Sequence, residues 1–203
     1  MLISVIITTY NNPKFLKQCL NSFVSQKDKN FEVIVADDGS SKETKELVYS
    51  YKDKLKINHV WHADEGFRAA KIRNEAVKIS SGKYLVFIDG DCITYNDFIK
   101  NHRKISEYGY FARGNRAMLS HSFSKHIINS DQDINLISNI EILKLRFFKD
   151  INRILPTIRI TNLPFRKIFK TKWRGAKTCN LGVWKEDFVN INGYNESYVG
   201  WGR

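Results

Sequence analysis

The first ninety residues alternate between short apolar runs and segments with helical spacing. Four runs have the length and composition of buried strands, at residues 2–9, 31–36, 57–61 and 84–88, the third being the least apolar. Neighbouring parallel strands need a crossover connection, usually a helix, so this alternation predicts a parallel sheet. Helices would cover both faces of that sheet, which makes the predicted fold class α/β.

The segments between these runs have the features of helices. Asn-Asn-Pro at residues 11–13 opens the first, whose apolar positions share one face at residues 16, 19, 20, 23 and 24. Ser40 and Glu43 have the spacing of a capping box, which predicts a second helix that ends at Tyr49. A third helix is expected over residues 68–79.

The second half of the chain is less regular. Its pattern predicts a helix over 96–108, a strand over 110–119, a long helix over 134–152 and a short strand over 178–184. Residues 190–202 are rich in Gly, Asn and aromatic residues, which favours a loop. We therefore expect a single domain made of two halves, residues 1–119 and residues 120–203.

Composition excludes several classes of protein. The chain has 203 residues, 42% of them hydrophobic, which is enough material for the core of one domain. Its apolar runs are far shorter than the ~18 residues of a membrane-spanning helix, and its first residues lack a signal-peptide pattern. Three scattered cysteines are too few for a disulfide framework, so we expect a reducing, cytoplasmic setting.

The positive charge is concentrated in one region. The net charge is +12, and eleven Lys and Arg residues lie between Lys144 and Lys177 with one acid, Asp150. Such a block favours an anionic partner: nucleic acid, phospholipid head groups or a phosphorylated substrate. The alternative is a solvated surface face. The first hundred residues are close to neutral, with 15 basic and 13 acidic groups.

Polar clusters follow three of the four predicted strands. They are Thr8-Thr9-Tyr10-Asn11, Asp37-Asp38-Gly39-Ser40 and Asp89-Gly90-Asp91. Ligands of open α/β sheets bind beyond the carboxyl ends of the strands, so the three clusters are expected to converge on one cleft. Each cluster alone could simply form a turn or cap a helix.

The third cluster indicates a cation site. Two carboxylates that flank a glycine at the end of a strand can point into one site and hold a hard divalent cation. Manganese or magnesium at that position would neutralise negative charge on a leaving diphosphate.

Other catalytic and phosphate-binding motifs are absent. The sequence has neither a GxGxxG turn after the first strand nor a GxxxxGK[ST] loop, which disfavours dinucleotide oxidoreductases and P-loop nucleotidases. No Ser–His–Asp arrangement is readable. The five histidines lack metal-ligand spacing, and His121 with His126 is interpreted as a solvated pair.

The motifs together resemble family 2 glycosyltransferases. The matching segments, in the family's order, are VIITTYNN, VIVADDGS, EGFRAAKIRN, YLVFIDGD and CNLGVWKEDFVNINGYNESYVGWG. The last is similar to the C-terminal motif of chondroitin-polymerase-like and galactosyltransferase-like members. The resemblance covers residues 2–119 and 173–203 and is weak between them. It implies a GT-A (Rossmann-like) fold with a mixed, mainly parallel sheet.

The resemblance also implies roles for individual residues. Thr8, Thr9, Tyr10 and Asn11 would line the nucleotide pocket, and Asp37 or Asp38 would accept a hydrogen bond from the base. One of Arg68, Lys71 and Arg73 would approach the diphosphate or the metal-binding carboxylates. Asp91 would ligate manganese or magnesium, with Asp89 and Gly90 beside it. All of these positions match the family's motifs in this sequence.

The C-terminal motif implies an acceptor side. Cys179, Asn180, Gly200 and Trp201 would lie near the transferred sugar or the acceptor. In the family, Gly-Trp-Gly runs on into an acidic pair that supplies the general base, whereas this sequence reaches Arg203 first. We therefore expect the 203 residues to be part of a longer enzyme, and this exact chain to bind donor but to transfer sugar weakly or not at all.

The sequence thus predicts an inverting, metal-dependent glycosyltransferase of the hexosyltransferase type. Its donor would be a nucleotide-diphosphate sugar, with a UDP-sugar favoured, and its acceptor a glycan or lipid-linked molecule of polysaccharide, lipopolysaccharide or capsule synthesis. Residues 144–177 would contact an anionic membrane surface, which makes the protein peripheral on the inner face of the membrane.

Three alternatives stay open at this point. One is a basic membrane- or nucleic-acid-binding module on an α/β scaffold, because aromatic residues between 147 and 173 interleave with Arg and Lys. Nucleic acid is the less favoured of these two partners. Another is a catalytically inactive protein that binds nucleotide sugars. A sugar nucleotidyltransferase is disfavoured because its Gly-rich, basic N-terminal signature is missing.

Overall fold

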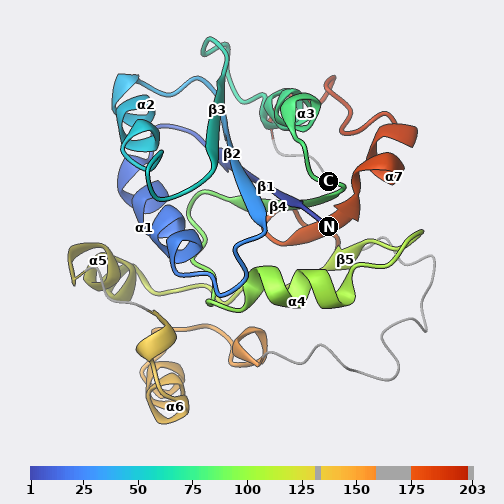
Figure 1. The fold of residues 1–203 in the computed structure, drawn as a ribbon. Helices are drawn as coiled ribbons and strands as arrows, with labels where there is room; N and C mark the ends of the chain where they lie inside the picture. Colours follow the sequence, from blue (N-terminus) through green and yellow to red (C-terminus); the bar gives the residue numbers. More distant parts are fainter. Residues whose placement is uncertain (131–133, 159–174, 201–203) are drawn as a thin grey trace.

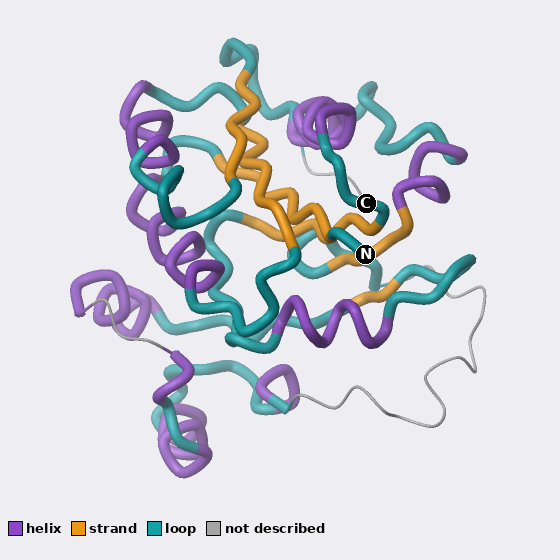
Figure 2. The backbone as a smooth tube through the Cα atoms, viewed as in Figure 1, coloured by secondary structure: helices purple, strands orange, loops and turns teal. Residues whose placement is uncertain are grey.

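The computed structural model describes residues 1–130, 134–158 and 175–200 (Figures 1 and 2). Its strands are β1 (Ile3–Thr9), β2 (Phe31–Asp37), β3 (Ile57–Trp61), β4 (Tyr84–Asp89), β5 (Ala112–Arg113) and β6 (Leu181–Trp184). Its α-helices are α1 (Pro13–Val24), α2 (Lys42–Tyr49), α3 (Ala69–Ile79), α4 (Phe98–Ile105), α5 (His121–Ser130), α6 (Asn139–Phe147) and α7 (Lys185–Asn190). Two short 3₁₀-helices are η1 (Ile134–Leu136) and η2 (Leu155–Thr157).

One six-stranded sheet organises the domain. The strand order is β3-β2-β1-β4-β6-β5. The pairs formed by β1, β2, β3 and β4 are parallel, whereas β6 is antiparallel to both β4 and β5. The predicted fold class is therefore confirmed as a mixed, mainly parallel α/β sheet.

Helices cover both faces of the sheet, as the alternation predicts. On one face, α1 and α2 bury residues such as Leu16 and Phe23 against Val5 and Val33. On the other face, α3 and α7 pack onto the sheet through the cluster that contains Ile6, Ile34, Ile72, Ala76 and Phe188. Figure 1 shows α1 and α2 on the opposite side of the strands from α3 and α7. Successive residues of β1 thus point to opposite faces.

The capping box predicted at Ser40 is wrong. Helix α2 begins one residue later, with Ser41 at its N-cap and no side-chain capping bond. The hydroxyl of Ser40 instead accepts a hydrogen bond from the backbone N–H of Asn11, at 2.8 Å. A capping box does form elsewhere, at the start of α6, between Ser138 and Glu141.

The second half departs most from the sequence prediction. The strand expected over 110–119 is reduced to β5, and the helix expected over 134–152 divides into η1 and α6 because Ser138 starts a new helix. The helix expected over 96–108 is the shorter α4, and α5 and α7 were not predicted. The short strand expected over 178–184 is β6. Residues 159–174 of the basic block lie outside the described residues.

Within the described residues, no helix combines the length and apolar character that a bilayer crossing requires.

A buried carboxylate holds the amino-terminal end of the sheet together. Glu32 on β2 accepts hydrogen bonds from the hydroxyl of Ser4 on β1 at 2.7 Å and from the backbone N–H of Ser81 at 2.6 Å. Lys56 lies 3.3 Å from its other oxygen, and the Glu32 side chain is only 1% exposed. Burial alone would raise the pKa of Glu32, but the hydrogen bonds and Lys56 outweigh burial and lower it.

We therefore expect Glu32→Ala to reduce the free energy of unfolding by about 1–3 kcal/mol, because it leaves buried donors unpaired. Since the pKa of Glu32 is lowered in the folded protein, its contribution is full above the pKa of the unfolded chain and is lost as the pH falls. Urea denaturation at neutral and acidic pH measures both effects. Glu46→Ala, which removes an exposed carboxylate on α2, is the matched control and should change stability by less than about 0.5 kcal/mol. Equal losses for the two variants would contradict the structural role of Glu32.

Candidate functional site

The three polar clusters lie side by side at the carboxyl edge of the sheet. Strand β1 is flanked by β2 and β4, and their register places Thr9 opposite Asp37 and Thr8 opposite Asp89. Backbone hydrogen bonds to the carbonyls of β1 continue beyond the strands, from Asp38 to Thr9 at 3.0 Å and from Gly90 to Thr8 at 2.8 Å. The topology therefore brings the three clusters together, although Thr8 in the first and Asp91 in the third are 83 positions apart in sequence. This is the convergence that the sequence predicts.

Asn11 joins the first cluster to the second. Its side-chain oxygen accepts the backbone N–H of Ser41 at 2.9 Å, while its own N–H donates to Ser40. Its φ of 43° is in the left-handed region, which Asn tolerates better than most residues. The turn after β1 is thus shaped by its contact with the turn after β2.

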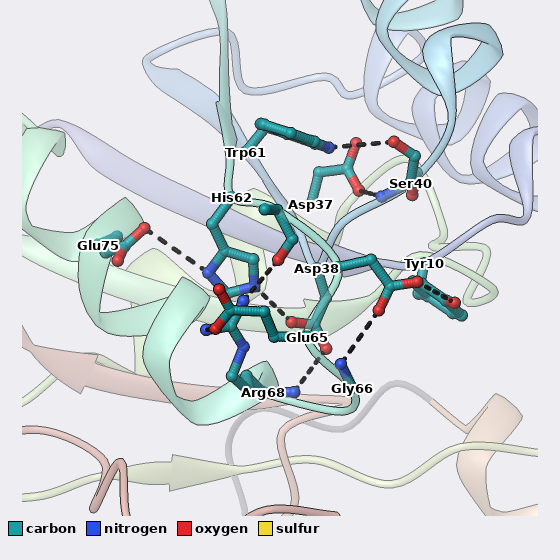
Figure 3. A network of polar contacts seen from close by, with 12 residues as sticks. Tyr10, Asp37, Asp38, Ser40, Trp61, His62, Glu65, Gly66, Arg68 and Glu75 are labelled. Atoms are coloured by element: carbon teal, nitrogen blue, oxygen red, sulfur yellow. Dashed lines mark hydrogen bonds and ion pairs between the residues drawn. The ribbon is translucent and has the colours of Figure 1, made fainter.

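Asp37 and Asp38 are buried and internally bonded. Asp37 accepts the backbone N–H of Ser40 at 2.8 Å and contacts Nε2 of His59 at 2.8 Å. Asp38 contacts Nε2 of His62 at 2.6 Å and accepts the backbone N–H of Arg68 at 2.9 Å. These bonds fix both carboxylates in orientation (Figure 3). Neither histidine was assigned a role from the sequence; His59 lies on β3, and His62 directly follows that strand.

The loop between β3 and α3 lies directly over the acidic pair. A Cβ on Gly39 would come within 2.6 Å of the Cα of Asp64, so the residue must be glycine for the loop to approach. The Tyr10 hydroxyl donates to Asp64 at 2.7 Å, and Asp64 also accepts the Gly66 N–H at 3.1 Å. Figure 3 shows this loop and Tyr10 closing around Asp38. The Tyr10 ring is half exposed, which leaves an aromatic face at the rim.

The three basic residues predicted on α3 differ in their positions. Arg73 reaches the site: its Nε donates to the Thr8 hydroxyl at 2.7 Å, and one terminal nitrogen lies 3.4 Å from Asp89. The Arg68 guanidinium pairs with Glu65 and the carbonyl of Ala63, so this side chain faces the β3–α3 loop. Lys71 is partly exposed on α3. Arg73 is therefore the α3 residue that contacts the metal-motif carboxylate.

A second arginine, which the sequence analysis missed, also contacts Asp89. Arg116 lies in the loop after β5 and donates to Asp89 at 3.1 Å. Thr178 approaches the same carboxylate at 3.5 Å. No local pattern marked Arg116, because its contact depends on the antiparallel edge of the sheet and spans 27 residues. Asp89 is thus held between two cations.

Asp89 and Asp91 have the geometry of a cation site. Oxygens of the two carboxylates and the sulfur of Cys92 all lie within 4.8 Å of one another. Burial raises the pKa of Asp89, Arg73 opposes the shift, and the neighbouring charge of Asp91 adds to it. Burial also raises the pKa of the Cys92 thiol, and sulfur is a softer ligand than the oxygens that a hard divalent cation prefers. A pair of carboxylates fits manganese or magnesium, and Asp91 is exposed to receive it.

The glycine between these carboxylates is dictated by packing. A Cβ on Gly90 would lie 3.0 Å from the Thr8 carbonyl and 3.1 Å from Cβ of Thr9. Any side chain there would push the metal-motif turn away from β1.

The predicted acceptor-side residues lie around the same edge. Cys179 is buried, and Asn180 places its side-chain oxygen 3.0 Å from Nε2 of His102 on α4. The Asn180 carbonyl accepts the Gly114 N–H at 2.8 Å. Gly200, with a φ of 97°, donates its N–H to the carbonyl of Phe67 at 3.1 Å. Trp201 lies outside the described residues.

His102 is a buried neutral base behind Asn180. It packs edge-on against Phe98 with ring centroids 4.6 Å apart. Burial lowers its pKa to about 4, although the Asn180 hydrogen bond opposes the shift. A neutral ring donates from one nitrogen only, so a contact with the Asn180 oxygen places the proton on Nε2. His102 therefore holds the Asn180 amide in one orientation.

A large cleft opens next to the metal motif. Its volume is about 500 Å³. It is lined by polar groups that include Arg113, Arg116 and Asn180. Apolar residues from α4, α5, η1, α6 and η2 form the rest of its walls. The cleft thus connects the carboxyl edge of the sheet with the second half of the chain.

Two protein-family models match the chain. One, described as glycosyl transferase family 2, covers residues 4–107. The other, described as the N-terminal domain of galactosyltransferase, covers residues 165–203.

Curated relatives are similar over most of the chain. Validoxylamine A glucosyltransferase from Streptomyces hygroscopicus subsp. jinggangensis is 27% identical over 99% of this chain and 49% of its own length. An uncharacterized glycosyltransferase from Rickettsia bellii is 30% identical over 89% of this chain and 26% of its own length. The chain therefore spans about half or less of the length of these relatives.

Solved structures are similar at a lower level. The mannosyltransferase PcManGT from Pyrobaculum calidifontis, in complex with GDP-Man and Mn²⁺, is 22% identical with a TM-score of 0.49, covering 56% of this chain and 35% of that one. S. aureus TarS in complex with UDP-GlcNAc is 24% identical with a TM-score of 0.46, covering 75% of this chain and 55% of that one.

The lowered pKa of His102 predicts a stability change at acidic pH. Between the ordinary value of 6.5 and about 4, the unfolded chain binds a proton that the folded protein does not. The free energy of unfolding should therefore fall as the pH falls through this window, by up to about 3 kcal/mol. Denaturation curves of the wild type and His102→Gln measure this, and the variant should lose that part of the pH dependence. Identical pH profiles would contradict a buried neutral His102.

Proposed function

Because the chain belongs to glycosyl transferase family 2, we propose that it binds a nucleotide-diphosphate sugar and transfers the sugar to an acceptor hydroxyl. The observation that carries this proposal is the convergence of three polar clusters beyond β1, β2 and β4. The buried acidic pair lies at one end of this edge and the metal-motif carboxylates lie at the other. A nucleotide bound across these strand ends would place its base at the acidic pair and its diphosphate at the metal-motif carboxylates.

The proposed base site is formed by Tyr10, Asp37 and Asp38. A carboxylate accepts a hydrogen bond from N3–H of uracil and repels the N3 lone pair of cytosine, so we propose a UDP-sugar donor. Two fixed partners hold each carboxylate and leave it further acceptor capacity. The half-exposed Tyr10 ring offers a face on which a base can stack.

The proposed diphosphate site is formed by Arg73, Arg116, Asp89 and Asp91. Manganese or magnesium would be held mainly by Asp91, with Asp89 beside it. The cation would neutralise negative charge on the leaving diphosphate. The two arginines that now pair with Asp89 lie where they can donate to phosphate oxygens. Lys71 is a further candidate cation on the same helix.

For the transfer step we propose single displacement with inversion at the anomeric carbon. Asn180, held by His102, and Cys179 would face the transferred sugar, with Gly200 and Trp201 on the acceptor side. A carboxylate base must lie within about 2.6–3.2 Å of the attacking hydroxyl. We expect it in the acidic pair that follows the Gly-Trp-Gly motif in related sequences. The acceptor class we propose is a glycan or a lipid-linked molecule.

Titration calorimetry with UDP tests the donor site. We expect manganese to increase UDP affinity, and Asp91→Asn to remove that increase, a loss on the order of tenfold to a hundredfold for charge-assisted contacts. Asp53→Asn, which neutralises an exposed acid far from the site, should leave UDP binding unchanged.

Two results would sink the donor proposal. One is UDP binding that does not respond to manganese in the wild type. The other is equal affinity for UDP and CDP, which would remove the role assigned to the acidic pair. Tighter binding of GDP than of UDP would move the donor class to guanosine sugars.

Arg116 is expected to contact the diphosphate rather than the base. Arg116→Gln should lower UDP affinity about tenfold and leave the affinity for uridine unchanged, because uridine lacks the phosphates. Arg153→Gln removes an exposed arginine from the second half and serves as the control. If Arg116→Gln weakens uridine and UDP equally, the arginine acts through the fold of the site instead.

A further inference from the structure

Helix α6 carries two apolar faces. Ile142 and Leu145 point inward: Ile142 is buried, and both residues line the cleft next to the metal motif. Ile140, Leu143 and Phe147 follow the i, i+3, i+7 spacing and therefore share a second face, which we term the outer face of α6. An apolar helix face is stable when another surface removes it from water, so a helix with two apolar faces needs two such partner surfaces.

The outer face is exposed in the described part of the chain. Ile140 is 67% exposed, Leu143 58% and Phe147 80%. Leu136 and Phe148, which flank the helix, are 78% and 69% exposed. Figure 1 shows α6 at the periphery of the molecule, away from the sheet. A contiguous group of large exposed apolar side chains marks an interaction surface.

Positive charges border this face on both sides. Lys144 is one position after Leu143, and Arg146 is one position before Phe147, so they flank the stripe around the helix. Lys149 and Arg153 follow and are also exposed. Among the described residues, these four cations form no salt bridge.

The nearby acids are turned to other partners. Glu141 closes the capping box with Ser138 at the start of α6. Asp150 accepts the hydroxyl of Ser120 at 2.6 Å. The outer face therefore presents hydrocarbon bordered by cations that form no salt bridge among the described residues, although Glu141 attracts Lys144.

This combination fits an anionic lipid surface better than other partners. Base stacking is the main source of sequence-tolerant nucleic-acid binding, and of the outer face only Phe147 could stack, because Ile140 and Leu143 are aliphatic. A second copy packed face to face would bring Lys144 and Arg146 of one chain against the same cations of the other. An interfacial helix, by contrast, buries its apolar stripe among acyl chains while Lys and Arg reach the head groups.

We propose that the outer face of α6 docks the protein on an anionic membrane. The opposite face of the same helix lines the cleft beside Asp89 and Asp91, so docking would hold the mouth of that cleft close to the lipid surface. An acceptor embedded in the membrane could then reach the cleft without leaving the bilayer. Docking does not depend on which nucleotide binds at the carboxyl edge of the sheet.

Vesicle flotation tests the proposal with the complete chain. The wild type should float with phosphatidylcholine vesicles that contain about 30% phosphatidylglycerol and not with phosphatidylcholine alone. Lys144→Gln with Arg146→Gln should reduce the partition coefficient onto these vesicles about 10- to 30-fold, from about 1 kcal/mol per cation. Ile140→Ser, Leu143→Ser and Phe147→Ser together should reduce it at least tenfold.

Matched controls separate docking from bulk charge and from misfolding. Lys42→Gln with Lys45→Gln on α2 removes the same charge from another exposed helix, and Val189→Ser with Ile191→Ser removes exposed apolar groups near α7. Both controls should float like the wild type. Unchanged thermal unfolding of every variant shows that the fold is intact.

Three outcomes would overturn the proposal. The first is a wild type that ignores phosphatidylglycerol. The second is an equal loss of flotation in the α2 control, which would make attraction a property of total charge. The third is a dimer in light scattering that Leu143→Ser converts to monomer, because a second copy would then cover the outer face.

Discussion

The parallel pairing of β1 with both β2 and β4 is the constraint on which the rest of the structure depends. It brings the turns after three strands to one edge, and the bonds from Asp38 and Gly90 to the carbonyls of β1 extend the pairing into those turns. Side chains in the turns are therefore positioned by the most rigid part of the fold. Glu32 stabilises the opposite end of the same strands, where it joins Ser4 to Ser81. A change in strand register would move every polar group of the site at once.

Charge balance at that edge explains how the carboxylates of Asp89 and Asp91 can lie close to one another. Asp89 is partly buried, and its contacts with Arg73 and Arg116 partly oppose the rise in its pKa that burial and the neighbouring Asp91 cause. A divalent cation at the carboxylates would compete with these arginines for Asp89 and would repel them. The arginines would then be available to an incoming diphosphate, so that metal and anion are expected to favour each other's binding.

Much of the first half could be predicted from the sequence, because its signals are local. The apolar runs that became β1, β2 and β4 are short, strand-forming and bounded by polar turns, and α1 shows its buried face in the spacing of Leu16 and Phe23. The contacts of His62 and Arg116 were not predictable, since each reaches a carboxylate more than twenty residues away through pairing that no local pattern encodes. The N-cap of α2 is Ser41 instead of Ser40 for a similar reason. The hydroxyl of Ser40 accepts a hydrogen bond from Asn11, which lies in the turn after the neighbouring strand. The roles assigned to the site residues stay predictions, since geometry alone shows where they lie.

The second half was harder to predict because its helices and strands depend on the surfaces they pack against more than on the intrinsic secondary-structure propensity of their residues. Strand β5 pairs with β6 alone, and both strands lie at the antiparallel edge of a sheet in which β1, β2, β3 and β4 pair in parallel. Helix α6 gives no clear amphipathic signal, since apolar residues occupy two of its faces. That ambiguity is itself informative: one face closes the cleft beside the metal motif, and the other remains in solvent among cations. A helix with apolar residues on both an inner and an outer face does not show the single apolar stripe by which amphipathic helices are recognised in a sequence. Under the proposed docking, the weakest part of the pattern is where a partner outside the fold would contribute to its selection.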